Sequence, residues 1–598
     1  MAAETYGQRL LNRNIPDKYK ITGPVTKKEL KARMNQLAHE DPAQYIQTIT
    51  HLKRTGDELS TLEGLSIGLD DIAPQYSARD RALKPLQKKF DEALNDKQRR
   101  EIAVQAQNAL LSGVSKHPGS LTLQVNSGAR GNPVQYANMV SGLGYARTPT
   151  GKPVPWLIGQ SYAEGLSPAS HWATTGQSMM DVIKTYTAIS EPGELSKKLI
   201  AGMADAVITD MDCGTQNGIR MRATSPDAVD RYLARDVGPF KRGTLITPQI
   251  QPKLAKTSGK ITVRSPMTCE SSDGVCQKCQ GLDEKGNVHT PGVNVGVRAA
   301  QAMSEPLTQF ALNAKHGGRT LKTDKSQVHG IAGFRQIIET PRQFVNKATL
   351  SSRDGVVRKI ESAPQGGHHV YVDDAKHYVI PDLNVKVRKG DKVEAGDVLS
   401  EGIPKPDEVV RHKGISAGRL YMVNTLKNLY KGQGKDMDSR HFELLAKSGL
   451  NHVRVLEDPS GQFIKGDVVG YNNLKAHLSK NMKHVPLNDA LGETLGKEYH
   501  QFSAGMRVTQ SVVDTLRRHG IKEVAIAPRA PSVEFTMKSA TMVPRMHPDW
   551  LARMAHQGLK TTVQQAAHTG QKAELHGTHP VPAYVYGVEF GQGESGRY

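Results

Sequence analysis

Long apolar runs are missing from the sequence. No stretch approaches the roughly 20 apolar residues that a membrane-spanning helix needs, and the opening residues MAAETYGQRL lack the apolar centre of a secretion signal. The sequence therefore predicts a soluble, intracellular protein that does not bind a membrane.

Aromatic residues are also scarce, at 5% of the chain. This argues against single-strand binding by stacked bases as the main function, because that device needs aromatic platforms. Basic residues, in contrast, give a formal net charge of +20. Such an excess predicts a polyanionic partner, as in histones, ribosomal proteins and polymerases.

With 598 residues the chain should form several domains, since single cores stop growing near ~250–300 residues.

Cysteine occurs only four times, which excludes a disulfide scaffold in so long a chain. Cys269, Cys276 and Cys279 form a C-x6-C-x2-C pattern, and the close pair suits two thiolates that bind one tetrahedral ion. Cys213 would be the fourth ligand. Four thiolates leave no position for water, so the pattern predicts one structural Zn²⁺. Buried free thiols are the alternative, and a zinc hydrolase is disfavoured because no H-E-x-x-H motif is present.

The stretch 293–318, VNVGVRAAQAMSEPLTQFALNAKHGG, holds the main candidate site. A helix of about three turns can start at Pro306. At 3.6 residues per turn it places two amides, an aliphatic side chain and an imidazole on one face: Gln309, Leu312, Asn313 and His316. The pair Gly317-Gly318 would end this helix and act as a hinge. An ordinary amphipathic helix is the alternative for this face alone.

In these residues the chain resembles the trigger loop of the largest, β′-type subunit of multi-subunit DNA-dependent RNA polymerases. The resemblance implies a mobile helix in which Gln309 and Asn313 address the ribose of the incoming nucleotide. It implies further that Leu312 packs on the base and that His316 reaches the phosphates. Two positions depart from the bacterial pattern, since Asn313 replaces an arginine and Lys315 an aromatic residue.

Other stretches resemble the same family. DCGT around Cys213 and VRSPMTCESSDGVCQKCQG at 263–281 are similar to its zinc site. Residues 164–200 stand where the bridge helix belongs, and a helix from Pro168 to about Ser190 would span about 35 Å. In the register we favour, Thr187 and Ala188 pack under the templating base. A buried helix with a Met-rich face is the alternative there. Arg130 either contacts phosphate or braces the fold.

The predicted fold class is α+β with several domains: a long bridge helix, a mobile trigger helix, a four-cysteine zinc site, a barrel-sandwich hybrid β module and helical clamp segments. The segments we expect are an N-terminal helical segment 1–66, a helical hairpin at the secondary-channel rim 67–125, a supporting loop with the bridge helix 126–205, a zinc-binding region 206–292, the trigger loop 293–345, a barrel-sandwich hybrid and jaw-like region 346–480, and an αβ unit with a clamp segment 481–598. The pattern GTLITPQIQPKLAKTSGKITVRSP recurs faintly at 505–528, which predicts a duplicated αβ unit.

The family's metal-binding motif NADFDGD is absent. The resemblance therefore implies that the catalytic Mg²⁺ ions are held by a partner chain. The pair Asp210 and Asp212 abuts a predicted zinc ligand and is better interpreted as local turn chemistry. The implied partners are an amino-terminal β′-like chain, β-like chains, template DNA, RNA product, nucleoside triphosphates and a sigma-like or accessory factor.

The sequence thus predicts the carboxy-terminal part of a split β′ subunit, a nucleotidyltransferase that is active only in a complex. A zinc-stabilised basic scaffold that binds nucleic acid without catalysis is the alternative. The short split form resembles those of giant bacteriophages and also those of cyanobacteria and plastids. We expect a cytoplasmic location, in the host bacterium if the chain is viral, with packaging in the virion or a plastid setting left open.

Overall fold

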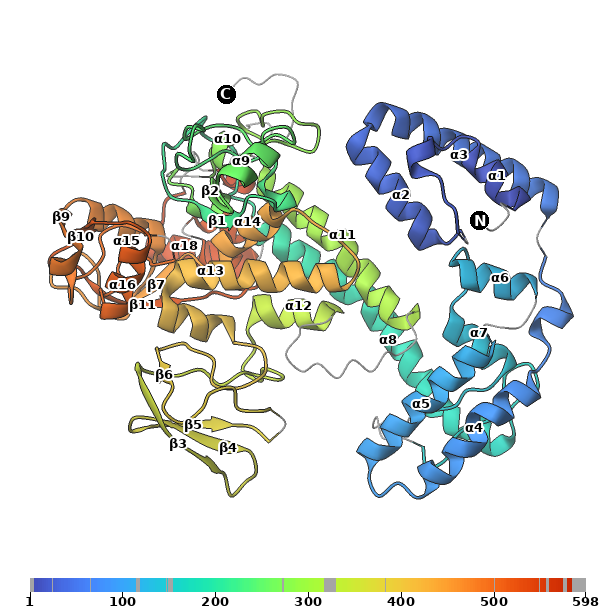
Figure 1. Cartoon of the computed structure of the whole chain (residues 1–598). Helices are drawn as coiled ribbons and strands as arrows, with labels where there is room; N and C mark the ends of the chain where they lie inside the picture. The colour runs from blue at the N-terminus through green and yellow to red at the C-terminus, as the bar shows by residue number, and fades with distance from the viewer. Residues whose placement is uncertain are drawn as a thin grey trace. The chain divides into compact units, whose positions relative to one another are not determined.

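The computed structural model divides the chain into two compact units, Met1–Ala188 with Leu312–Lys322, and Ile189–Ala311 with Thr323–Tyr598. Each unit is described by itself (Figure 1). The structure describes residues 5–582 apart from 24, 65, 115–118, 147, 149–153, 272–273, 317–329, 382, 500, 548, 555–558 and 574–577.

The first unit is helical in its described part. Its elements are α1 (Tyr6–Asn12), η1 (Asp17–Tyr19), α2 (Lys27–Glu40), α3 (Pro42–Glu63), η2 (Leu69–Ile72), α4 (Tyr76–Asp91), α5 (Asp96–Val114), α6 (Ser120–Ser127), α7 (Pro133–Val140) and the first part of α8 (Pro168–Gly202).

The predicted helical hairpin is present as α4 and α5, which run side by side in Figure 1. Phe90 of α4 and Ala106 of α5 are fully buried in a shared apolar core. Between the two helices Asn95 Oδ1 accepts the Gln98 N–H and satisfies a free donor at the start of α5. This hairpin is therefore built from local signals that the sequence carries.

Helix α8 is longer than predicted, because it runs through Pro192 to Gly202 instead of ending near Ser190. A proline inside a helix removes one backbone hydrogen bond. The residues that follow compensate, since Leu195, Leu199 and Met203 are buried in the main core of the second unit. No described helix, α8 included, is both long enough and apolar enough to cross a bilayer.

The second unit combines helices with small sheets. Its helices are the end of α8, η3 (Pro226–Ala228), α9 (Gln251–Thr257), η4 (Pro266–Thr268), α10 (Gln277–Gln280), α11 (Val295–His316, whose last residues belong to the first unit), α12 (Gly330–Glu339), α13 (Pro406–Gly432), α14 (Ser439–Gly449), α15 (Tyr471–Ser479), η5 (Leu487–Ala490), α16 (Gln510–Arg518), η6 (Pro544–Met546), α17 (Trp550–Met554) and α18 (Leu559–Thr569).

The main core of this unit gathers around Tyr430 of α13. Its ring packs edge-on against Phe310 of α11, Phe334 of α12 and Phe442 of α14, with centroids 5.1, 6.0 and 5.0 Å away. The Tyr430 hydroxyl donates to the Met303 carbonyl oxygen over 2.7 Å, so the one polar atom of this cluster is paired. Helices α11 to α14 are thereby fixed to one another.

Within the region 346–480, for which we predicted a β module, the structure has a four-stranded antiparallel sheet in the order β5-β4-β3-β6. Its strands are β3 (Gly355–Ser362), β4 (His368–Val372), β5 (Ala375–Val379) and β6 (Lys392–Val393). The inward side chains form a separate core, with Val357, Val370 and Val379 fully buried. This sheet is a half-barrel, which agrees with the predicted β module.

The remaining strands form short antiparallel pairings in the orders β1-β2, β10-β9 and β11-β7-β8. They are β1 (Ile219–Arg222), β2 (Lys260–Val263), β7 (His452–Glu457), β8 (Val468–Gly470), β9 (Lys483–Pro486), β10 (Glu523–Ile526) and β11 (Ser532–Thr536).

The predicted duplication of an αβ unit is supported by the backbone pairing. The bridges extend the repeat to residues 231–266 for the first copy and 493–528 for the second. Isolated bridges join Val237 to Phe240 and Tyr232 to Leu245 in the first copy. Bridges join Tyr499 to Phe502 and Thr494 to Arg507 in the second, so each position recurs after a constant interval of 262 residues. Each copy continues with a helix and then a strand, α9 and β2 in one and α16 and β10 in the other.

Candidate functional site

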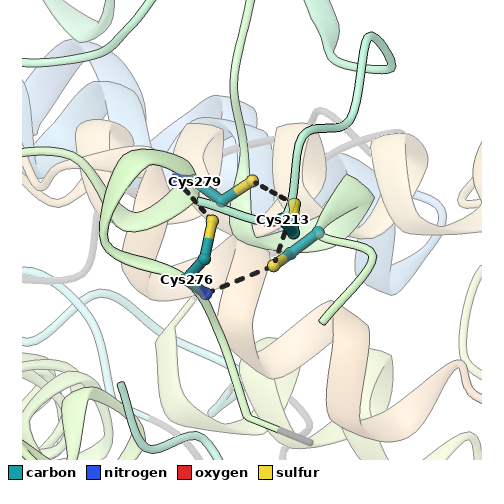
Figure 2. A group of neighbouring side chains, drawn as sticks. Cys213, Cys276 and Cys279 are labelled. Atoms are coloured by element: carbon teal, nitrogen blue, oxygen red, sulfur yellow. Dashed lines mark hydrogen bonds between the residues drawn. The ribbon is translucent and has the colours of Figure 1, made fainter. Parts of the chain in front are cut away.

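The four cysteines meet at one point of the second unit. Their sulfur atoms all lie within 4.8 Å of one another. Figure 2 shows Cys213 facing the pair Cys276 and Cys279. Cys269, Cys276 and Cys279 are buried, and Cys213 is partly exposed. The sequence prediction that these four side chains converge is therefore confirmed.

Backbone pairing brings the distant Cys213 to this point. Ile208 forms a parallel bridge with Val275. The Gln277 N–H then donates to the Asp210 carbonyl oxygen over 2.8 Å, so residues 207–211 run beside the loop that holds the close cysteine pair. A ligand far away in sequence thus becomes a neighbour through the contact between these two segments.

The spacing of the sulfurs fits a tetrahedral metal centre. Zinc–sulfur bonds of about 2.3 Å in a tetrahedron place the sulfurs about 3.8 Å apart. The Cys213 sulfur lies 3.7 Å from that of Cys279 and 3.8 Å from that of Cys269. Four soft sulfur donors at this spacing suit Zn²⁺ and leave no position for a reacting water molecule.

The sulfurs lie beside hydrogen-bond donors that stabilise negative charge. The buried Arg264 guanidinium donates to Cys213, Cys276 and Cys279 with nitrogen–sulfur distances of 3.2, 3.5 and 3.3 Å. The Cys276 N–H donates to the Cys269 sulfur over 3.3 Å. Interactions with the other three cysteines lower the pKa of Cys269 well below its ordinary value, whereas interactions with Cys213 and Cys269 raise the pKa of Cys276 and Cys279. Negative charge held on Cys269, in a cluster beside the Arg264 guanidinium, suits a bound cation.

Asp212 has a local structural role, as the sequence predicted. Its carboxylate accepts hydrogen bonds from the Arg264 guanidinium over 2.8 Å and from the Lys278 amine over 2.9 Å. It also accepts the Gly214 N–H over 2.9 Å. With these partners the carboxylate positions Arg264 beside the sulfurs.

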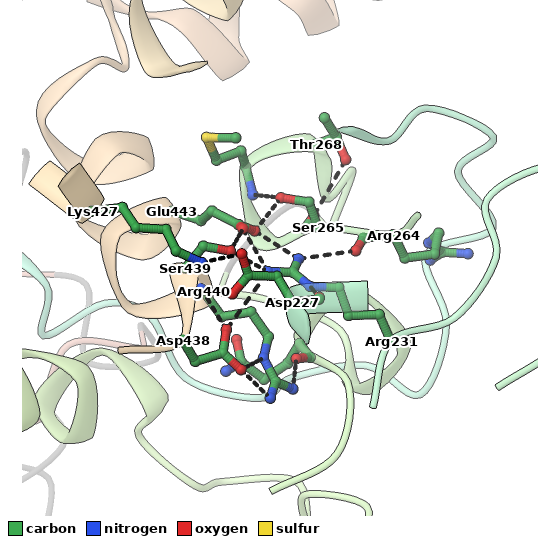
Figure 3. A network of polar contacts seen from close by, with 12 residues as sticks. Asp227, Arg231, Arg264, Ser265, Thr268, Lys427, Asp438, Ser439, Arg440 and Glu443 are labelled. Carbon is green, nitrogen blue, oxygen red and sulfur yellow. Dashed lines mark hydrogen bonds and ion pairs between the residues drawn. The ribbon is translucent and has the colours of Figure 1, made fainter. Parts of the chain in front are cut away.

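A buried charged network next to the cysteines was not predicted from the sequence. Figure 3 shows Arg231 against Glu443 of α14. Two short hydrogen bonds of 2.6 and 2.9 Å join the guanidinium to the carboxylate. Ser265 also donates to Glu443, over 2.6 Å. The side chains of Arg231 and Glu443 are 1% and 0% exposed, so the pair connects the first αβ copy to α14 through fully desolvated charges.

No signal in the sequence marks this pair. Arg231 and Glu443 lie more than 200 positions apart, and each stands in a segment that alternates charged and apolar residues. Only the fold shows that both are interior.

The candidate trigger helix begins at Val295, not at Pro306 as predicted. The Asn294 side chain accepts the Val297 N–H over 2.8 Å and caps this earlier start. Met303, Leu307 and Phe310 then form a buried face that outweighs the hydrogen bond lost at Pro306. The helix ends at His316, ahead of the predicted glycine pair.

The four predicted nucleotide-contacting residues stand on the second half of this helix. Gln309 is half-buried. The side chains of Leu312, Asn313 and His316, and the residues Gly317 and Gly318, lie outside the described part of the structure. At 100° per residue the four positions fall on a different side of the helix from Met303, Leu307 and Phe310. The buried face of α11 therefore does not use the predicted site positions.

The other predicted contact residues are placed only in outline. Thr187 and Ala188 belong to the helical backbone of α8, and their side chains lie outside the described part. Arg130 is exposed, in the loop between α6 and α7. Its exposure is compatible with a phosphate contact, and its role stays a prediction.

Comparison with known proteins finds related sequences of one kind. The family model described as RNA polymerase Rpb1, domain 5, matches residues 165–465. The β′ subunit of DNA-directed RNA polymerase from Acidothermus cellulolyticus is 27% identical over 78% of this chain and 39% of its own length. Those of Parafrankia sp. and Thermus aquaticus are 29% and 28% identical over 78% of this chain, which covers 39% and 33% of them. The chain thus spans about two fifths or less of the length of these β′ subunits.

Proposed function

This chain belongs to the RNA polymerase family defined by Rpb1 domain 5, and from this we infer that it is a subunit of a DNA-directed RNA polymerase. The observation that supports the proposal most is the run of related sequence, which covers 78% of the chain in several β′ subunits. That run includes the four-cysteine centre and α11. The reaction would be template-directed transfer of a nucleotidyl group to the 3′ end of an RNA chain.

We propose that α11 contributes positioning to this reaction. Gln309 and Asn313 would hydrogen-bond the ribose, and Leu312 would pack on the base of the incoming nucleoside triphosphate. His316 would lie at the phosphates, as a proton donor to the departing pyrophosphate or as a positive charge beside it. Orientation and charge stabilisation of this kind account for most of the catalysis in phosphoryl transfer.

The catalytic metal ions would be held by another chain. When bound, two Mg²⁺ ions activate the attacking 3′ oxygen and stabilise the leaving group. The NADFDGD motif that holds them in this family is absent here, and Asp212 is engaged by Arg264 and Lys278. We therefore propose that this chain acts only with an amino-terminal β′-like chain and with β-like chains, on template DNA, in the cytoplasm of a bacterial cell.

Helix α8 would serve as the bridge helix. It contains 35 residues, which corresponds to about 50 Å at 1.5 Å per residue. In the register proposed from the sequence, Thr187 and Ala188 would support the templating base, and Arg130 would contact phosphate from its exposed loop.

The four cysteines would hold one structural Zn²⁺. The sulfur spacing and the hydrogen bonds from Arg264 support this assignment. The ion would fix residues 207–214 against residues 269–281 and so maintain the base from which α11 starts at Val295.

Reconstitution tests the proposal. The tagged full chain is co-purified with the chains encoded beside it and then supplied with a primed template and nucleoside triphosphates. We expect the assembly to extend the primer and the chain alone to give no product, because it lacks the metal-binding aspartates. Extension by the chain alone, or a failure to associate with β-like chains, would contradict the proposal.

A further inference from the structure

A basic groove lies between the two copies of the duplicated αβ unit. Its volume is about 380 Å³. The first copy and the adjoining strand β1 contribute Arg220, Arg235 and Lys260, and the second copy contributes Arg518 and His519. All these elements belong to the second unit, so their arrangement is internal to one compact body.

The positive charges of this groove are not compensated. Arg220, Lys260 and Arg518 are exposed, and Arg235 is half-buried. None of these four forms an ion pair with any residue that the structure describes. The one carboxylate among the lining residues, Asp236, is already used, since it pairs with Lys241 and accepts the Arg242 N–H over 2.7 Å. A groove with this surplus attracts an anion.

One hydrogen bond joins two residues of the lining. The Arg220 guanidinium, on β1, donates to Nδ1 of His519 over 3.1 Å. Burial, together with the positive charges of Arg220, Arg518 and Arg235, lowers the pKa of His519. A neutral His519 accepts this hydrogen bond and adds no positive charge, so the charge of the groove comes from its three arginines and Lys260.

The composition of the lining indicates which anion. Apart from the imidazole of His519, no aromatic ring is among the described residues that line the groove, so stacking on bases is not available. Arginine side chains bind phosphate through paired N–H groups, and several in a row match the repeated charge of a polynucleotide.

A second cavity adjoins the groove. Arg220 and His519 also line this cavity of about 230 Å³, together with the buried residues Arg419 and Glu498.

We propose that the groove between the two αβ copies is a binding site for the phosphate backbone of a nucleic acid. Binding in this groove would depend on the charge of the phosphates and not on the base sequence, because the lining offers no aromatic ring on which a base could stack. It is separate from the assignment of α11 as a trigger helix, and its test needs no catalysis.

Salt-dependent binding of the full chain to labelled duplex DNA and to single-stranded RNA tests the proposal. The groove variant carries Arg220→Gln, Arg235→Gln, Lys260→Gln and Arg518→Gln. The matched control removes four exposed basic side chains of the half-barrel region: Lys386→Gln, Arg388→Gln, Lys389→Gln and Lys392→Gln. Both variants change the net charge equally.

We expect the slope of log affinity against log salt to fall by about 0.7–0.9 for each lost phosphate contact in the groove variant only. Affinity at moderate salt should fall at least tenfold, and the nucleic acid with the larger change identifies the natural ligand. Equal slopes for the groove variant and the control would overturn the proposal. The single variants Lys260→Gln and Arg518→Gln, each with a smaller change in slope, keep the test valid if the fourfold variant does not fold.

Crosslinking in the assembled complex is the second arm. A photoreactive amino acid replaces the exposed Lys260, or Lys389 as the control. The proposal predicts crosslinks from position 260 to nucleic acid and none from position 389. Crosslinks from position 260 to protein alone would assign the groove to an acidic protein partner and overturn the proposal.

Discussion

At the scale of single residues, Arg264 is the side chain on which the cysteine centre depends most. It is 1% exposed, and its donors reach three of the four sulfurs as well as Asp212. Side chains that hold metal ligands in place in this way typically change metal affinity about ten- to hundredfold when they are removed. Arg264 thus belongs to the proposed zinc site although it is not a ligand.

We predict that Arg264→Met weakens zinc binding by about ten- to hundredfold, because the thiolates lose their positive neighbour. Competition with a chelator, followed by metal analysis, measures this change, and the parent chain should contain one zinc ion. Lys278→Met is the matched control, since Lys278 contacts the same Asp212 but donates to no sulfur in the described structure. A zinc-free parent chain, or equal losses in both variants, would contradict the assignment.

The pair Arg231 and Glu443 makes a prediction about stability. Removing one partner leaves a buried charge without compensation, which costs about 3–5 kcal/mol. Arg231→Met and Glu443→Leu should each lower the free energy of unfolding by that amount, measured in urea. The double variant should lose less than the sum, because the isolated charge is gone. Losses that simply add would show that the two side chains do not interact.

The residues of the site differ in how far the sequence could identify them. Cys269, Cys276 and Cys279 were predictable, because their spacing follows from the geometry of metal binding, and Cys213 is the one other cysteine of the chain. Arg231, Arg264 and Glu443 were not, because a charged residue is expected at the surface unless a partner is known. Those partners come from distant segments, such as α14 for Arg231, and only the fold reveals them.

At the scale of elements, the two errors of the sequence analysis share a cause. Prolines at 192 and 306 suggested helix boundaries, yet α8 and α11 continue through both. In each case apolar residues beyond or before the proline are buried in the core. Tertiary packing thus outweighed a local signal, whereas the hairpin α4 and α5 was predictable because its local and tertiary signals agree.

Two glycines make this packing testable. A Cβ atom at Gly296, near the start of α11, would lie 1.9 Å from the Met203 carbonyl oxygen. A Cβ atom at Gly193, inside α8, would meet nothing within 4 Å. The first substitution should therefore disturb the junction of α8 and α11, and the second should strengthen its helix.

We predict that Gly296→Ala lowers local stability by about 1–3 kcal/mol through overpacking. Gly193→Ala should raise it by about 0.5–1 kcal/mol, since alanine favours the helix. Amide hydrogen exchange measures both changes in stability. The exchange rate of residues 295–311 should rise roughly tenfold or more in Gly296→Ala, and that of residues 189–202 should fall in Gly193→Ala. An unchanged exchange rate in Gly296→Ala would contradict the close packing of Gly296 against the Met203 carbonyl oxygen.

At the scale of the whole molecule, the chain combines two compact units, a net charge of +20 and the absence of the catalytic metal motif. These features suit a subunit that positions nucleic acid and nucleotide while another chain holds the metal ions. The four-cysteine centre and the basic groove both lie in the second unit, and α8 and α11 each contribute residues to both units. The units are therefore joined by the two helices to which we assign catalytic positioning.

The central claim is that α11 closes on the incoming nucleotide, and the rate of single-nucleotide addition by the reconstituted polymerase tests it most directly. His316→Ala and Leu312→Ala should each slow addition at least tenfold and leave template binding intact. Thr308→Ala, an exposed position on the same helix, should add nucleotides at the parent rate. Parent-like rates for both His316→Ala and Leu312→Ala would contradict the claim.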